Sequence, residues 1–172
     1  MKIINALFIG LFALIFSACA TTNVTFNNNP DYRTKIKSAF VQVKDVQLGF
    51  FLKGLTDSLV YNLERNNVTI RTVKTDVLSL ESEKDIHIQI QEFNPDVIIL
   101  LERVDKNMAS SKYGTYYSGG VYSMSIKIPD KDKTIWKAAI STDGELRGDG
   151  NTRIIKETIQ QIIAKMKSDQ LL

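Results

Sequence analysis

The chain has 172 residues, of which 22 are basic and 19 acidic, so its formal net charge is +3. No block of like charge stands out, and the sequence therefore indicates neither a nucleic-acid-binding stripe nor a polybasic membrane patch. The length suits a single domain. No internal repeat or low-complexity linker divides the chain.

The amino-terminal stretch is apolar and ends at the only cysteine of the chain. Lys2 precedes an uncharged run over residues 3–16, which is too short for a transmembrane helix. A charged start, an apolar centre and small residues, here Ser17 and Ala18, are typical of a secretory signal peptide. We therefore expect a signal peptide over residues 1–18.

Cys19 follows these small residues directly, so the stretch resembles the lipobox of bacterial lipoproteins, with Phe16 where that family most often has leucine. The resemblance implies that Cys19 becomes the new N-terminus and carries a diacylglycerol and usually a further acyl chain such as palmitate. Two or more chains anchor a protein stably. The alternative is an ordinary secretory signal, which would leave an exported reactive thiol.

In that family the residue after the cysteine influences sorting, and Ala20 is not the aspartate associated with the inner membrane. The resemblance thus implies a lipid-anchored protein of the bacterial cell envelope, at the outer membrane and facing the periplasm. If the source has a single membrane, the alternative is the outer face of that membrane. Residues 19–38 are polar and rich in Asn and Thr, which predicts a lipidated tether. In the alternative, Val24 and Phe26 belong to an edge strand.

We expect residues 39–172 to form a single α/β domain. Residues 39–44 alternate apolar and polar side chains, as strands do, and residues 68–73 predict a second strand. Between them, leucines spaced by three and four residues predict a helix that ends near Asn66 and Asn67, with its apolar face made by Leu48, Leu52, Leu55, Leu59 and Leu63. A strand, helix and strand in this order favour parallel pairing.

Residues 82–93 fit two patterns. Ile86, Ile88 and Ile90 alternate as in a strand, but Ser82 can cap a helix and Asn94-Pro95 can end one, so we favour a helix. Residues 96–104 contain five consecutive large apolar side chains, which predict a central strand.

The segment over residues 105–120 is rich in Gly and Ser and predicts a loop. It carries Tyr113, Tyr116 and Tyr117, which make it the candidate partner-contact surface, since tyrosine recurs at adaptable recognition surfaces. A mobile connection that happens to hold tyrosines is the alternative. Two alternating strands over about 121–128 and 134–142 predict a hairpin, and a helix from about Asn151 closes the chain.

The elements together predict an α/β two-layer sandwich, with a mixed sheet of about five strands and two or three helices. The hairpin around Ile128-Pro129-Asp130 and Ile135-Trp136-Lys137-Ala138 resembles one found in envelope lipoprotein families. The element order is similar to that of the LPS-assembly lipoprotein and of the N-terminal domain of the Tol system's β-propeller protein. Those domains bind protein or lipid partners, so the resemblance implies an accessory role.

Catalytic motifs are scarce. His87 is the single histidine, on an amphipathic segment where a surface role is expected, and no phosphate-binding glycine loop or nucleophile elbow occurs. Asp143, Glu145 and Asp149 depart from the spacing of a calcium loop. We therefore predict no catalytic residue, no metal, no cofactor and no nucleic-acid partner.

Two hypotheses remain. The first is a non-enzymatic, membrane-anchored envelope lipoprotein that acts through an envelope protein or a glycan. The second is a surface-anchored carbohydrate binder or hydrolase acting through carboxylates. A groove holding two close, available acidic residues would favour the second hypothesis.

Overall fold

The computed structural model describes residues 21–44, 49–75, 79–112, 114–131, 133–143 and 149–172. The predicted signal peptide over residues 1–18, Cys19 and Ala20 lie outside the described residues. The described elements are β1 (Thr21–Asn28), β2 (Ser38–Lys44), α2 (Phe50–Arg65), β3 (Thr69–Thr75), α3 (Glu83–Phe93), β4 (Val97–Ser111), β5 (Gly114–Ile128), β6 (Lys133–Asp143) and α4 (Asp149–Ser168).

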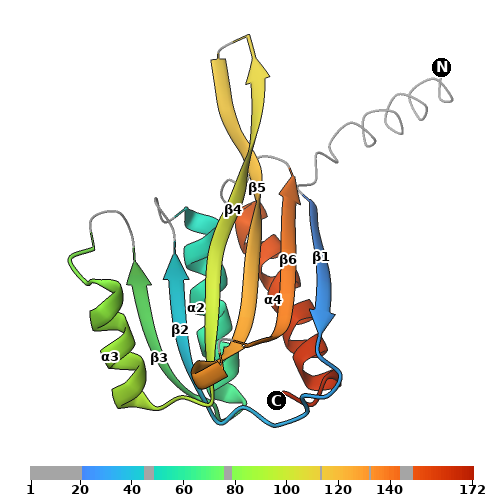
Figure 1. Cartoon of the computed structure of the whole chain (residues 1–172). Helices are drawn as coiled ribbons and strands as arrows, with labels where there is room; N and C mark the ends of the chain where they lie inside the picture. The colour runs from blue at the N-terminus through green and yellow to red at the C-terminus, as the bar shows by residue number, and fades with distance from the viewer. Residues whose placement is uncertain (1–20, 45–48, 76–78, 113, 132, 144–148) are drawn as a thin grey trace, which may run out of the picture.

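The strands form one open mixed sheet in the order β1-β6-β5-β4-β2-β3 (Figure 1). β2 pairs in parallel with both β3 and β4, as the strand, helix, strand order predicts. The neighbours β4-β5, β5-β6 and β6-β1 are antiparallel. The predicted α/β class with a mixed sheet is confirmed, and β1 brings the number of described strands to six.

The first strand corrects part of the tether prediction. Residues 19–38 were expected to be a flexible tether, but β1 pairs with β6 over its whole length. Val24 and Phe26 pack against the core, and the Phe26 and Trp136 ring centroids are 5.5 Å apart. The Asn and Thr residues that suggest a loop alternate with these two apolar side chains, because a helix covers only one face of the sheet at β1.

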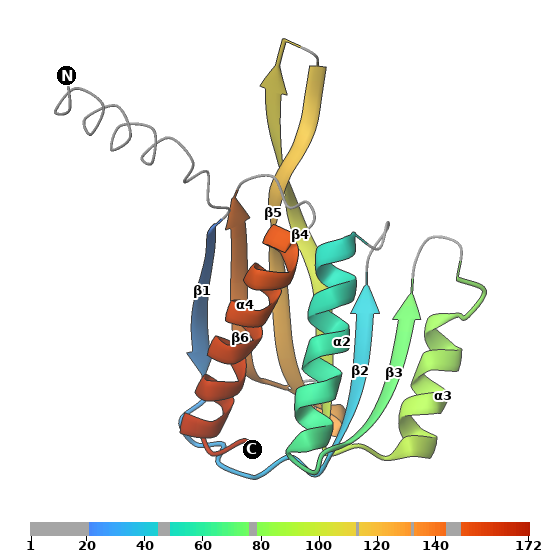
Figure 2. The same ribbon diagram turned by 180° about the vertical axis from the view of Figure 1, so that it is seen from behind.

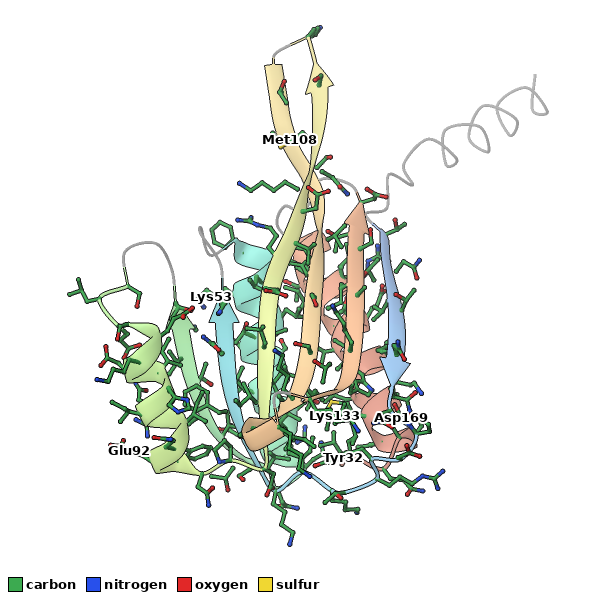
Figure 3. All side chains as sticks on the ribbon, in the orientation of Figure 1. Tyr32, Lys53, Glu92, Met108, Lys133 and Asp169 are labelled. Carbon is green, nitrogen blue, oxygen red and sulfur yellow. The ribbon has the colours of Figure 1, made fainter. Side chains whose placement is uncertain are left out.

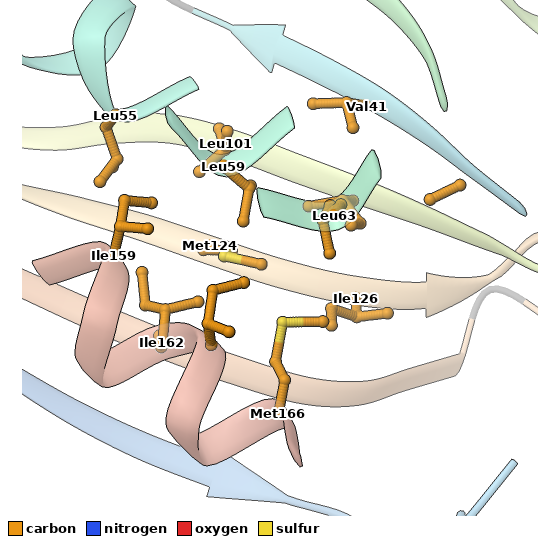
Figure 4. Packing of buried hydrophobic residues seen from close by; sticks show 14 of the residues in the cluster. Val41, Leu55, Leu59, Leu63, Leu101, Met124, Ile126, Ile159, Ile162 and Met166 are labelled. Carbon is orange, nitrogen blue, oxygen red and sulfur yellow. The ribbon is translucent and has the colours of Figure 1, made fainter. Parts of the chain in front are cut away.

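Helices α2 and α4 cover one face of the sheet (Figure 2). The leucines of α2 interlock with the isoleucines of α4 above the apolar face of the strands (Figure 4). Each such side chain contributes about 1.5–3 kcal/mol by leaving water. The central contacts are made by Leu55, Leu59, Leu63, Ile159, Ile162, Met166, Val41, Leu101, Met124 and Ile126.

Helix α3 packs on the opposite face of the sheet, over β2 and β3. It therefore adds a partial third layer along the β3 edge of the sheet. A small cluster around Phe40, Val73 and Ile86 fills the contact. The helix prediction for residues 82–93 is confirmed. Ser82 and Asp85 form a reciprocal capping box at the start, and Asn94 adopts a left-handed conformation, φ 47°, at the end.

Candidate contact surface

The longest strands of the sheet, β4 and β5, run past their neighbours. β2 pairs with β4 only as far as Glu102, and β6 pairs with β5 only from Gly119 onward, whereas β4 and β5 pair with each other up to Ser111 and Gly114. Beyond the sheet they continue as a two-stranded ribbon (Figures 1 and 2). We call residues 108–112 and 114–118 the arm.

The arm corrects the loop prediction for residues 105–120, because its described residues are almost all in strands. The sequence hides this, since neither face of a projecting ribbon is buried and no apolar alternation results. Tyr113 lies outside the described residues. For Tyr116 and Tyr117 the structure describes the backbone alone, opposite Ala109 and Met108. Their role in partner contact stays a prediction.

Two irregularities in the ladder lie at the base of the arm. Val104 is an extra residue between the pairs Arg103↔Tyr122 and Asp105↔Val121, and Ser118 is skipped between Asn107↔Gly119 and Met108↔Tyr117. Bulges of this kind increase the local right-handed twist. Figure 1 shows the two strands crossing over each other at this point.

Gly119 fixes how the base of the arm meets β6. Its φ is 136°, a conformation that residues with a side chain rarely adopt. A Cβ atom there would overlap the carbonyl oxygen of Thr142 and would lie 2.9 Å from its carbonyl carbon. Only glycine therefore lets β5 approach β6 this closely.

Side-chain hydrogen bonds tie the three strands together at the same level. Asn107 Nδ2 donates to the Thr142 carbonyl at 3.2 Å and to Asp143 Oδ1 at 3.0 Å. The fully buried Thr142 hydroxyl accepts from the Gly120 N–H at 3.0 Å and donates to the Gly120 carbonyl at 3.3 Å. Each hydrogen bond contributes about 0.5–1.5 kcal/mol, so the base is held firmly.

The start of β1 lies at the same end of the sheet as the arm. Thr21 pairs with Asp143, Asp143 with Gly119, and Gly119 with Asn107, so these four residues form one row across four strands. The chain therefore enters the sheet, two residues after Cys19, at the level from which the arm projects.

Two large apolar side chains are exposed at the arm and just below it. Met108 is 57% exposed and Val104 is 62% exposed, although both are large apolar residues. Met108 lies at the end of the sheet opposite Lys133 and Asp169 (Figure 3). Across the arm, the Ser110 and Thr115 hydroxyls are 3.4 Å apart. An isolated two-stranded ribbon is marginally stable in water, so such an arm is suited to contact another surface.

Helix α2 flanks two grooves on the surface. One, of about 550 Å³, lies between α2 and β3 and contains the carboxylates of Asp57 and Glu64. Asp57 is bound by Lys53 at 2.9 Å and by Lys74 at 3.8 Å. A second groove, of about 420 Å³, lies between α2 and α4 and is lined by Ser58, Asn62 and other residues without a carboxylate. Neither groove offers a pair of available carboxylates.

Of the other candidate residues, His87 lies apart from the arm and Asp143 lies at its base. His87 is exposed on α3. Asp143 binds Asn107, whereas Glu145 and the Asp149 side chain lie outside the described part of the chain. Within that part, no group of three His, Cys, Asp or Glu residues could hold a metal ion, and no helix is long and apolar enough to cross a membrane.

No protein-family model matches the sequence, and no curated protein does so. Solved structures are similar in fold. The PelC dodecamer from Paraburkholderia phytofirmans has a TM-score of 0.56 at 11% identity, over 88% of this chain and 99% of that chain. A single-substitution variant of that dodecamer has a TM-score of 0.52 at 11% identity, over 79% and 92% of the two chains. Lipoprotein GNA1162 from Neisseria meningitidis has a TM-score of 0.46 at 11% identity, over 76% and 98%. The chain thus shares the fold of PelC.

Proposed function

We propose that this chain is a non-enzymatic lipoprotein of the bacterial cell envelope, anchored through Cys19 at the outer membrane and facing the periplasm. Its role is accessory, in the assembly of an envelope component through contacts to protein or glycan. The arm, with Tyr113, Tyr116 and Tyr117, is one contact surface of the chain, and the two edge strands of the sheet are available for contacts to protein.

The observation that carries the assembly role is the fold, which 88% of this chain shares with 99% of the length of a protein described as a dodecamer. We extend this to the present chain and propose that it works as an oligomer of its own copies. The open sheet supports the idea, because β1 and β3 leave two edge strands available for pairing between copies.

The anchoring is tested on the full chain, produced in a bacterium that processes lipoproteins. Cys19→Ser should abolish palmitate labelling and release the protein from the membrane fraction, because no thiol remains to be acylated. Ser17→Ala, which keeps a small residue in the signal, is the matched control and should label normally. A native chain that begins at another residue, or has the mass of an unmodified polypeptide, would contradict the proposal.

The assembly is tested by native mass spectrometry of the lipidated protein in mild detergent. We expect a closed oligomer with a defined number of subunits. Crosslinking in cells followed by mass spectrometry should then yield crosslinks between copies, together with any other envelope protein held by the assembly. A monomer in detergent that also gives only random neighbours in cells would refute the assembly role.

A further inference from the structure

We propose that the arm contacts the lipid surface itself and inserts its tip into the headgroup layer of the membrane that holds Cys19. The inference rests on the proposed anchoring and names the partner of the arm as a phospholipid surface. It follows from the position of the arm relative to the anchored end of the chain.

The register of the sheet fixes two positions along the strand direction, that of the start of β1 and that of the base of the arm. Thr21 and Asn107 lie in the same row, through Asp143 and Gly119. Cys19 is two residues before Thr21, and two residues span at most about 7 Å even when fully extended. The lipid-bearing residue thus lies no farther than this above the row.

The arm reaches higher than the anchor. Ser111, at its end, is four residues beyond Asn107, and four residues of antiparallel strand cover about 14 Å. The arm continues in the direction of the strands (Figures 1 and 2). Even if the two residues before Thr21 were fully extended along the strands, the tip of the arm would reach at least about 7 Å beyond the lipid-bearing residue. The polar layer on one side of a bilayer has a similar thickness, roughly 5–8 Å.

The base of the arm keeps it in this direction. Gly119 fits tightly against Thr142, and the Asn107 amide bridges to Thr142 and Asp143 on β6. β1 pairs with the same strand, over all eight of its residues. The anchored end and the arm are thus two parts of one ladder and keep their relative heights.

The composition of the arm suits a headgroup layer. Residues 108–118 include three of the six tyrosines of the chain, Met108 and a single charged residue, Lys112, with no acidic residue. Tyrosine gathers at membrane–water interfaces because its ring is apolar and its hydroxyl polar. A lysine near the surface is attracted to anionic lipids. The exposed Met108 adds an apolar side chain near the base of the arm.

The test uses the lipidated full chain in vesicles of phosphatidylethanolamine with a minority of phosphatidylglycerol. Because Cys19 is the only cysteine and its thiol is acylated, Ser110→Cys gives a single labelling site for a polarity-sensitive dye on the arm. Lys133→Cys, exposed at the opposite end of the sheet, is the control. Circular dichroism and intact mass confirm that both variants fold and carry lipid.

We expect the dye at position 110 to shift to shorter wavelength on reconstitution, to be quenched by headgroup-labelled lipid and to be protected from iodide. The fluorescence of the dye at position 133 should still be quenched by iodide. In addition, Tyr116→Ser combined with Tyr117→Ser should reduce lipid quenching at position 110.

If iodide quenches the dye at position 110 as strongly as the dye at position 133, the inference is overturned. The lipidated anchor is left intact by that result. Protection from iodide without lipid quenching would overturn the inference too, and would assign the arm to a neighbouring copy. If the purified chain has the mass of an unmodified polypeptide, it carries no lipid anchor, and the inference fails together with the proposed anchoring.

Discussion

Replacing Gly119 with alanine tests whether the base of the arm is as tight as the structure indicates. The substitution places a Cβ on a residue with φ 136°, against the Thr142 carbonyl. Backbone strain of this kind costs about 1–3 kcal/mol. The overlap must then be relieved by moving β5 away from β6.

That movement stretches the hydrogen bonds that join the strands at this level. The Thr142 hydroxyl binds both backbone groups of Gly120, and the Thr142 carbonyl accepts from Asn107. Losing one or two of them costs about 0.5–1.5 kcal/mol each. We therefore expect Gly119→Ala to lower the free energy of unfolding by roughly 2–5 kcal/mol, a large part of the 5–15 kcal/mol typical of a domain.

The matched control is Gly114→Ala at the end of the arm. Gly114 also has a positive φ, 125°, but no atom outside its chain neighbours lies within 4 Å of the place that a Cβ would occupy. The strain there can be relieved by local fraying, so global stability should fall by less than about 1 kcal/mol. Urea unfolding of both variants measures the difference in their free energies of unfolding, provided that the two m-values are equal. Equal midpoints for the two variants would refute the tight base.

Three further substitutions have defined outcomes. Asn107→Ala removes two hydrogen bonds at the base and should cost about 1–3 kcal/mol in urea unfolding, with faster amide exchange in the arm. Leu59→Ala leaves a cavity in the fully buried core and should cost about 2–5 kcal/mol by the same assay. The Ser82 hydroxyl, followed by the Ser82 backbone N–H, lowers the pKa of Asp85 by hydrogen bonding. This contribution to stability is present above the unfolded-state pKa and is lost as pH falls through the lower folded pKa. Ser82→Ala should therefore raise the pKa of Asp85 toward its ordinary value, as NMR titration of its carboxyl would show.

The sequence predicted the elements that bury one continuous face. The leucine spacing in α2 and the capping residues around α3 are local signals, and the structure confirms both helices. The helix predicted from about Asn151 is also confirmed, as α4, and its Ile159, Ile162 and Met166 are buried.

The two wrong predictions share one physical cause. β1 is an edge strand from which Val24 and Phe26 pack against the core, and no side chain of the arm that the structure describes belongs to a core cluster. Strand signals in sequence depend on burial, so strands with little buried surface resemble loops. Their pairing is set by the neighbouring strand, which for β1 is far away in the sequence, since Asn28 pairs with Trp136.

These two weakly signalled elements are also the ones that orient the molecule. The height of the arm relative to Thr21 depends on backbone register, since it follows from one row of paired residues from Thr21 to Asn107. Substitutions on the arm should thus change how strongly it binds a surface without changing where it points. A substitution at Gly119 should do the reverse, because it moves β5 relative to β6 and leaves the chemistry of the arm unchanged. Comparing the two kinds of variant in the vesicle assay separates affinity from orientation.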